Sequence, residues 1–170
     1  MYCPSCGHLN LPGADQCEKC LFPLAPLDLP VPQDKVESSL MADPVSVLAP
    51  RPPVTVPDAA TLGDAVRQMM DRGVGAVLVT TPSGRLAGIL TERDFLTKVA
   101  GDPGFTAHPV REYMTPDPVT VAPTDRLAVA LHRMDIGGYR HLPVVDAGMP
   151  VGVISVRDVL RHVTRLCKDG

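Results

Sequence analysis

The residues with the clearest chemical potential lie at the N-terminus, where four of the five cysteines fall within the first 20 positions. The four, in two pairs with two residues between the members of each pair, are Cys3, Cys6, Cys17 and Cys20. In a reducing compartment such spacing favours a metal ion over disulfide bonds. Pro4 can stiffen the first turn, and Gly7 can let the backbone curl toward sulfur. We therefore expect a metal site with four thiolate ligands.

Other uses of these residues agree less well with the sequence. Two disulfide bonds would need an exported protein. The chain, however, opens with the cysteine cluster and not with the basic stretch and apolar run of a signal peptide. His8 could replace a thiolate, but with four thiols present we expect it at the surface. Four thiolate ligands leave no coordination position for a substrate, so hydrolytic metal chemistry is not expected.

A segment of about 20 residues cannot bury enough apolar surface to fold alone, whereas structural zinc supplies on the order of 10 to 16 kcal/mol. Residues 1–22 resemble a zinc ribbon from end to end, and this resemblance implies Zn²⁺ as the bound ion. The cysteine pairs are also similar to the iron site of rubredoxins, so spacing alone leaves iron, and with it an electron carrier, as an alternative. Asp15 and Glu18 outnumber Lys19, which favours a structural or protein-docking role over contact with nucleic acid.

The composition of the whole chain excludes several classes of protein. Its 170 residues are 45% hydrophobic and 21% charged, enough for a packed core. A net charge of −3, no Trp, three Tyr and three Phe argue against nucleic-acid binding and against attraction to anionic membranes. No apolar run is long enough for a membrane span, so we expect a soluble, cytoplasmic protein. No phosphate loop, nucleophile elbow, zinc-protease pair or complete dinucleotide fingerprint occurs, so we do not expect an enzyme.

A proline-rich segment separates the cysteines from the rest of the chain. Residues 23–33 contain four prolines, which fix the backbone torsion φ and remove hydrogen-bond donors, so we expect a semi-rigid spacer. Residues 34–41 could form a short helix capped by Asp34. The predicted organisation is a ribbon at 1–22, a linker with a lead-in helix at 23–43, and two repeats at 44–106 and 107–168.

The remainder of the chain is an internal duplication. A shift of 65 residues places segment 53–56 on segment 118–121, and both read PVTV. After a turn that is one residue shorter, a shift of 64 places segment 88–94, GILTERD, on segment 152–158, GVISVRD. A period this long exceeds that of solenoid repeats and indicates two copies of one small fold.

The periodicity of each copy predicts its elements. In the first copy a short strand at 53–56 precedes a helix at 61–72, in which apolar residues recur at helical spacing. Apolar runs at 76–79 and 86–90 flank a Pro-Ser-Gly turn and predict a hairpin, and a helix is expected at about 91–99. The order βαββα predicts an α+β fold whose helices cover one face of a small sheet. One copy of about 60 residues is marginal alone, so we expect the two copies to pack together and share a cleft.

These residues resemble the tandem cystathionine β-synthase (CBS) domain pair, the regulatory tandem called a Bateman module. The resemblance runs from about residue 44 to residue 167 and depends on the doubled PVTV strand, on the GAVLV and RHLPVV strands, and above all on the two heptapeptides. It implies that two βαββα repeats pack as a pair behind the zinc ribbon. It also implies a homodimer and, between the repeats, an adenosyl ligand such as AMP, ADP, ATP or S-adenosylmethionine.

The TERD and SVRD segments of the heptapeptides can be interpreted in two ways. A hydroxyl residue that opens a helix, with a carboxylate three positions later, is a common N-terminal cap. A helix N-terminus also attracts phosphate, and a carboxylate one turn on can accept hydrogen bonds from two ribose hydroxyls. Both interpretations can hold at once, and the family resemblance favours ligand binding by at least one copy.

The resemblance assigns ligand roles to residues of both copies. Asp94 and Asp158 would bind ribose hydroxyls, and Thr91 and Ser155 would bind ribose or phosphate. The residues that would meet adenine through main-chain groups and apolar contact are Thr55, Val56, Thr120 and Val121.

The two copies differ where phosphate would lie. Arg140 and His141 precede and begin a predicted strand of the second copy, where the family often places cations that face phosphate. The aligned residues of the first copy, Gly75 and Ala76, carry no charge. The two sites should therefore differ, although His141 could instead be a polar residue at a sheet edge.

The sequence thus predicts a non-enzymatic sensor that binds an adenosyl nucleotide between its repeats and signals to an unknown protein partner. For such a switch, the ligand must bind one arrangement of the repeats more tightly than another. The alternative is an adaptor associated with nucleic acid or transcription, in which the ribbon makes the contact and the repeats only dimerise. Binding to nucleic acid that weakens with salt would support the adaptor, while the acidic ribbon argues against it.

Overall fold

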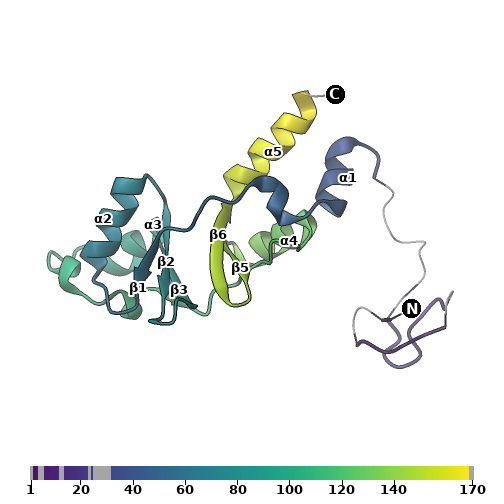
Figure 1. Cartoon of the computed structure of the whole chain (residues 1–170), viewed down its shortest axis with the longest axis horizontal. Coiled ribbons are helices and arrows are strands. Elements are labelled where there is room, and N and C mark those ends of the chain that lie inside the picture. The colour runs from purple at the N-terminus through teal and green to yellow at the C-terminus, as the bar shows by residue number, and fades with distance from the viewer. Residues whose placement is uncertain (1, 4–5, 12–13, 23, 25–31, 169–170) are drawn as a thin grey trace. The chain divides into compact units, whose positions relative to one another are not determined.

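The computed structural model describes residues 2–3, 6–11, 14–22, 24 and 32–168 of the chain (Figure 1). The chain divides into two compact units, residues 1–33 and residues 34–170, and each is considered by itself. Most of the predicted proline-rich linker lies outside the described residues, as does Pro4. Among the residues that are described, no helix is both long and apolar enough to span a membrane.

The N-terminal unit has a very small core that includes two of its cysteines. Cys3 and Cys17 are buried and pack with Leu24 and the partly buried Ala14. Asn10, also buried, links the two halves of the unit: its side-chain amide donates to the carbonyl of His8 at 2.9 Å and accepts from the N–H of Glu18 at 3.0 Å. Such a core is too small to stabilise the unit by apolar burial alone.

The second unit begins with α1 (Lys35–Ala42), which confirms the predicted lead-in helix. The side chain of Asp34 caps it by accepting a hydrogen bond of 2.8 Å from the N–H of Glu37. A short 3-10 helix, η2 (Val45–Leu48), follows.

A buried polar link joins α1 to the C-terminal helix of the chain. The hydroxyl of Ser39 donates to Asp43, so its oxygen accepts from Nε2 of His162, 2.7 Å away. Ser39 and His162 are both buried. Because one hydroxyl serves both hydrogen bonds and lies away from solvent, the link holds two helices together and does not form a nucleophilic site.

The first repeat forms a four-stranded sheet in the order β1-β2-β3-β4. Its strands are β1 (Thr55–Pro57), β2 (Ala76–Thr80), β3 (Leu86–Thr91) and β4 (Thr115–Pro116). β1 runs parallel to β2, whereas β3 is antiparallel to both of its neighbours. The predicted helix of this copy is confirmed as α2 (Leu62–Arg72), whose buried face packs on the sheet.

The closing helix of the first repeat begins where predicted but changes geometry. α3 (Glu92–Asp94) has three α-helical residues, and a π-helix, η3 (Phe95–Val99), continues it. The helix predicted at about 91–99 is therefore confirmed in its bounds, but its second half is π-helical and not α-helical. Both ends of η3 contact the first core. The short 3-10 helices η4 (Phe105–Ala107) and η5 (Val110–Glu112) then lead to β4.

The second repeat contains fewer strands than predicted. Its elements are α4 (Leu127–Gly137), β5 (His141–Asp146), β6 (Met149–Ser155) and α5 (Val156–Lys168). β5 and β6 form a separate antiparallel hairpin. The strand predicted at 118–121 is reduced to a single bridge between Val121 and Val144.

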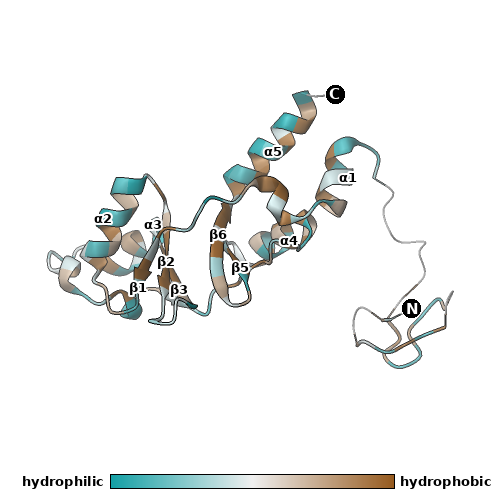
Figure 2. Ribbon diagram, in the orientation of Figure 1, coloured by the Kyte–Doolittle hydropathy of each residue, from teal (hydrophilic) through white to brown (hydrophobic). Residues whose placement is uncertain are grey.

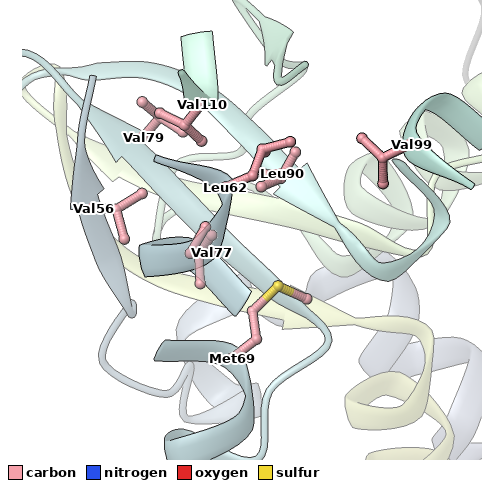
Figure 3. Close-up of a cluster of buried hydrophobic side chains, with 9 residues drawn as sticks. Val56, Leu62, Met69, Val77, Val79, Leu90, Val99 and Val110 are labelled. Atoms are coloured by element: carbon pink, nitrogen blue, oxygen red, sulfur yellow. The ribbon is translucent and has the colours of Figure 1, made fainter. Parts of the chain in front are cut away.

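The first core lies between the sheet and α2 (Figure 3). Side chains from β1, α2, β2 and β3 meet there with Val99 and Val110. The second core gathers α4, β5 and β6 around Val45, which belongs to η2. Val45 and Val110 are both fully buried, and the shift of 65 relates them. Each repeat is therefore completed by the segment that precedes the other repeat.

Backbone hydrogen bonds repeat this exchange. The N–H of Leu62 donates to the carbonyl of His108 at 2.8 Å, and the N–H of Leu127 donates to the carbonyl of Asp43 at 2.9 Å. The shift of 65 relates both donors and both acceptors. The first turn of each main helix is thus held by the preceding segment of the other repeat.

The two hairpins lie side by side with their turns at the same end. The N–H of Leu86 donates to the carbonyl of Gly148 at 3.4 Å near the turns, and Val153 of β6 packs against the buried cluster of Ala76, Leu78 and Ile89. The strands of both hairpins are strongly hydrophobic (Figure 2). The open ends of the hairpins, from which α3 and α5 start, therefore face the same way (Figure 1).

Candidate functional site

The four cysteines predicted to bind a metal lie together. All four sulfur atoms are within 4.8 Å of one another, with 3.6 Å between Cys3 and Cys20 and 3.6 Å between Cys6 and Cys17. Disulfide sulfurs are about 2.05 Å apart, and these cysteines are all free. Four sulfurs held at about 2.3 Å around one zinc ion would be about 3.8 Å apart. The cluster therefore fits a tetrahedral ion.

The two halves of the cysteine site have the same backbone conformation. The N–H of Gly7 donates to the carbonyl of Cys3, and the N–H of Leu21 donates to the carbonyl of Cys17, each at 2.9 Å. Gly7 has φ 70° and Leu21 has φ 59°, so both are left-handed. The sequence indicates this role for Gly7 but not for Leu21, where a β-carbon makes the conformation cost roughly 1 to 2 kcal/mol.

The thiols of the cluster differ in proton affinity. Burial raises the pKa of Cys17, but hydrogen bonds from the N–H groups of Cys20 and Lys19 outweigh burial and lower that pKa to about 6. A backbone hydrogen bond from His8 lowers the pKa of Cys6, but the thiol of Cys20 and burial raise it to about 12. Backbone N–H donors of this kind favour the thiolate, which is the form that binds a metal.

The first heptapeptide places Asp94 where α3 begins. Its Oδ2 accepts from the N–H of Thr91 at 2.8 Å and from the hydroxyl of Thr91 at 2.7 Å. Its Oδ1 forms an ion pair of 2.7 Å with Nζ of Lys98. Only 12% of the Asp94 side chain is exposed, so the carboxylate is held in place on both sides.

The second heptapeptide repeats this arrangement at α5. Oδ2 of Asp158 accepts from the N–H of Ser155 at 2.8 Å and from its hydroxyl at 2.6 Å. Oδ1 pairs with Arg161 at 3.0 Å, and 19% of the Asp158 side chain is exposed. The capping box is confirmed at α3, and at α5 the carboxylate of Asp158 accepts the same two hydrogen bonds from Ser155.

Asp94 and Asp158 both keep their negative charge to unusually low pH. In each case burial raises the pKa, but hydrogen bonds from the hydroxyl residue and from the neighbouring cation outweigh burial and hold the pKa below its usual range. The carboxylates are thus ionised acceptors at neutral pH.

Charges from both repeats meet around His141 at the open ends of the hairpins. Burial lowers the pKa of the half-buried His141. The negative charges of Glu92 and Asp158 raise this pKa, whereas the positive charges of Arg157 and Arg140 lower it further. Glu92 belongs to the first repeat and the other residues to the second. The structure therefore brings the two capped carboxylates and His141 to one end of the hairpin pair.

The residues predicted to meet adenine lie in different environments. Val56 and Val121 are buried, and their side chains belong to the two cores. Thr55 is exposed, while Thr120 is half-buried and its carbonyl accepts from Arg133. Because the valine side chains fill the cores, only main-chain groups remain to contact a ligand at those positions. The ligand roles of these residues stay predictions.

Two hollows lie outside the predicted ligand site. One of about 660 Å³ lies beside the π-helix and is lined by residues 95–96, 99–103 and 105. The other, of about 400 Å³, lies on α5 and is lined by Arg161, Thr164, Arg165 and Lys168. None of the predicted ligand residues lines either hollow.

The cations that flank the caps were not predicted from the sequence. Lys98 follows Asp94 by four residues, and Arg161 follows Asp158 by three. Side chains at these spacings meet on a helix surface, so the signal was present in the sequence. Glu92 was also not singled out, although it lies in the heptapeptide itself.

Comparison with known proteins agrees with this organisation. The CBS domain family matches residues 43–101 and 110–165. The CBS domain-containing protein CBSCBSPB5 of Arabidopsis thaliana is 43% identical over 109 residues, which cover 63% of this chain and 20% of the plant protein. An uncharacterized 17.7 kDa protein of Acidianus ambivalens is 34% identical over 122 residues, which cover 71% of this chain and 73% of that protein. The chain thus spans about a fifth of the length of several plant relatives, CBSCBSPB5 among them.

A solved structure has the same fold. The CBS domain protein PAE2072 from Pyrobaculum aerophilum, complexed with AMP, superposes with a TM-score of 0.64 at 30% sequence identity. The superposition covers 72% of this chain and 98% of the archaeal chain.

Proposed function

Because this chain belongs to the CBS-domain family, we propose that it is a regulatory protein that binds an adenosyl nucleotide between its two repeats. The ligand class is AMP, ADP, ATP or S-adenosylmethionine. The observation that best supports this proposal is the duplicated, ionised carboxylate, Asp94 and Asp158, at the same end of the two hairpins. The AMP bound by the Pyrobaculum relative supports adenine over other bases.

Each carboxylate keeps capacity for a ribose. Three hydrogen bonds or ion-pair contacts engage Asp94, and the same number engage Asp158. An ionised carboxylate offers about four acceptor sites, so about one remains for a sugar hydroxyl. A hydrogen bond to a charged group contributes roughly 1.5 to 3 kcal/mol, and here the acceptor is already held in position.

The proposed phosphate position lies beside the second repeat. Arg140 supplies the positive charge there, the imidazole of His141 can add a hydrogen bond, and Arg157 lies near the same imidazole. In the first repeat, Gly75 and Ala76 occupy the aligned positions and supply none. We therefore propose two unequal sites, of which the one beside Arg140 binds phosphate better.

We propose regulation and not catalysis. The hydroxyls of Thr91 and Ser155 donate to the carboxylates that follow them, so neither is arranged as a nucleophile. The ligand would act by binding one arrangement of the repeats more tightly than another, and a protein partner would respond to the shift.

A thermal-shift and calorimetric screen of the full chain tests this function. We expect AMP, ADP, ATP or S-adenosylmethionine to stabilise the protein, by about 2.7 kcal/mol at a hundred times the dissociation constant. GMP and GTP serve as controls for phosphate binding without adenine. Absence of binding by every adenosyl compound would overturn the proposal.

We further propose that the four cysteines bind zinc and that the ion forms the core of the N-terminal unit. The sulfur separations fit the ion, and the described residues of the unit include few other buried groups. Free thiolate ligands need reducing surroundings, so we place the protein in the cytoplasm. The ribbon then serves as a structural or protein-docking module.

Elemental analysis of the purified chain tests the metal. We expect about one zinc ion per chain, lost in Cys17→Ser and kept in Cys167→Ser, which removes the exposed fifth cysteine. If the purified protein is coloured and contains iron, iron would replace zinc in the proposal. A purified chain without metal would refute the proposed metal site.

We also propose a homodimer that forms through the closing helices. Leu96 and Leu160 occupy equivalent positions and are 75% and 60% exposed, which is unusual for leucine. Light scattering should give twice the chain mass of 18.1 kDa. The double variant Leu96→Asp, Leu160→Asp should give the monomer mass, and a dimer that persists in this variant would place the interface elsewhere.

A further inference from the structure

The carboxylate of Glu92 lies at the open end of the first hairpin, within the proposed site. Its backbone N–H donates to the carbonyl of Gly75 at 3.1 Å. Its side chain covers Gly75: the carboxyl carbon and Oε2 are each 3.2 Å from the point that a β-carbon on residue 75 would occupy. The lack of a side chain at Gly75 therefore lets the carboxylate lie here.

The hairpin packing brings this carboxylate toward the second repeat. Ala76, next to Gly75, belongs to a buried cluster against which Val153 of β6 packs, so the first hairpin adjoins the second. The charge of Glu92 acts on His141, together with those of Asp158, Arg157 and Arg140. Glu92 is the one group from the first repeat in this set.

The duplication shows that Glu92 has no counterpart. The shift that aligns the heptapeptides places Glu92 on Val156. The two N–H groups make equivalent bonds, that of Val156 to the carbonyl of Arg140 at 3.2 Å. The backbone is thus the same at both positions, and only the first repeat adds a negative charge.

Glu92 is also free to act on a ligand. No carboxylate oxygen of Glu92 lies within 4 Å of a cationic nitrogen in the part of the chain that the structure describes. Its side chain is exposed, and its neighbours on the helix, Asp94 and Lys98, pair with each other. Its charge is therefore not neutralised by a direct partner.

From this placement we infer that Glu92 is a specificity-determining residue that limits how many phosphates the site accepts. The inference rests on the proposed nucleotide function. One phosphate can be held by Arg140 and His141, but each added phosphate places further negative charge within reach of Glu92. The site then favours a nucleoside monophosphate over a triphosphate, because like charges at short range repel even in partly aqueous surroundings.

Calorimetry with AMP and ATP in magnesium-free buffer tests the inference on the full chain. In Glu92→Gln, which keeps the size of the side chain, we expect ATP to bind about three- to thirtyfold more tightly relative to AMP than in the parent. Glu112→Gln makes the same charge change on η5 and should leave that ratio unchanged. The mirror variant Val156→Glu should shift the ratio toward AMP.

The outcomes separate the inference from the proposed function. If the parent binds AMP, and both Glu92→Gln and Val156→Glu have the same ratio of ATP affinity to AMP affinity as the parent, the inference is wrong and the nucleotide function stands. If the parent binds no adenosyl compound, the proposed function fails and the inference fails with it. An equal shift of the ratio in Glu112→Gln would assign the effect to net charge and overturn the role of Glu92.

Discussion

The two repeats have the same cap in different surroundings. The N–H and hydroxyl distances are 2.8 and 2.7 Å at Asp94, against 2.8 and 2.6 Å at Asp158. Around the cap, the first repeat has an acid at Glu92, whereas the second has Arg140 and His141. The cap is thus common to both repeats, and under the proposed function its neighbours would determine what each site accepts.

The repeats also differ in how much secondary structure they keep. The first has four strands and a closing helix that turns into a π-helix, while the second has one hairpin and the 13-residue α5. The sequence pattern is shared, but the flanking segments differ. β4 extends the first sheet, whereas α1 packs on α4 and α5 of the second repeat.

The largest expected effect tests whether the repeats share their stability. Leu62 and Leu127 are equivalent and fully buried, and replacing such a leucine by alanine costs about 2 to 5 kcal/mol. Because each core includes a segment from outside its own repeat, we expect one urea transition, which Leu62→Ala and Leu127→Ala both lower. Met70→Ala, at an exposed position of α2, is the control. Two transitions, each moved by one variant alone, would show independent repeats.

The next effect compares the two carboxylates in ligand binding. We expect Asp158→Ala to weaken adenine nucleotide binding about ten- to hundredfold, because a charged hydrogen bond to ribose is lost. Asp94→Ala should weaken it less, because its repeat has Gly75 and Ala76 where the second has Arg140 and His141, and so no polar side chain for phosphate. Calorimetry measures both, with the exposed Asp146→Ala as control. Parental affinity in Asp158→Ala would defeat the assignment.

A smaller effect tests whether the caps are equivalent in stability. Removing the hydroxyl in Thr91→Ala or Ser155→Ala should cost about 0.5 to 2 kcal/mol. The matching distances predict similar losses in the two variants. Urea unfolding measures them. A loss confined to Ser155→Ala would show that the length of α5, and not the cap itself, determines the cost.

The smallest effect is a pH dependence that belongs to the second repeat, because the aligned residue of the first is Ala76. Burial is the main cause that lowers the pKa of His141 in the folded state, although Glu92 and Asp158 oppose it. The unfolded state therefore binds more protons, and stability falls as pH drops below the unfolded value of about 6.5.

Urea unfolding at pH 7.5 and pH 5.5 measures this contribution. The parent should lose more stability between these values than His141→Gln, which cannot titrate. The lowered pKa values of Asp94 and Asp158 contribute stability above the unfolded value of about 3.9, so both caps are intact in this range. Equal losses of stability in the parent and in His141→Gln would show that His141 is not the source of the pH dependence.

Much of the local structure could be predicted from the sequence because it depends on neighbouring residues. Helical spacing predicted α2, the apolar runs predicted β2 and β3, and the Thr91 and Ser155 positions predicted the caps. The four cysteines were predicted to converge, and they do.

The features that were not predicted depend on residues far apart in the chain. The PVTV motif forms β1 in the first repeat but only the Val121 bridge in the second, because strand pairing depends on the surroundings of the motif. Nothing in the sequence near Val45 indicates that it fills the core of the distant repeat. The left-handed Leu21 was missed because leucine carries no local signal for that conformation.

The reciprocal burial of Val45 and Val110 has a consequence for how such a protein could arise. A precursor with a single copy would lack the valine that completes its own hydrophobic core, since the other repeat supplies that residue. Two such chains would have to dimerise and exchange these segments in order to fold. Gene fusion would then have turned an encounter between molecules, which depends on concentration, into one within a single polypeptide.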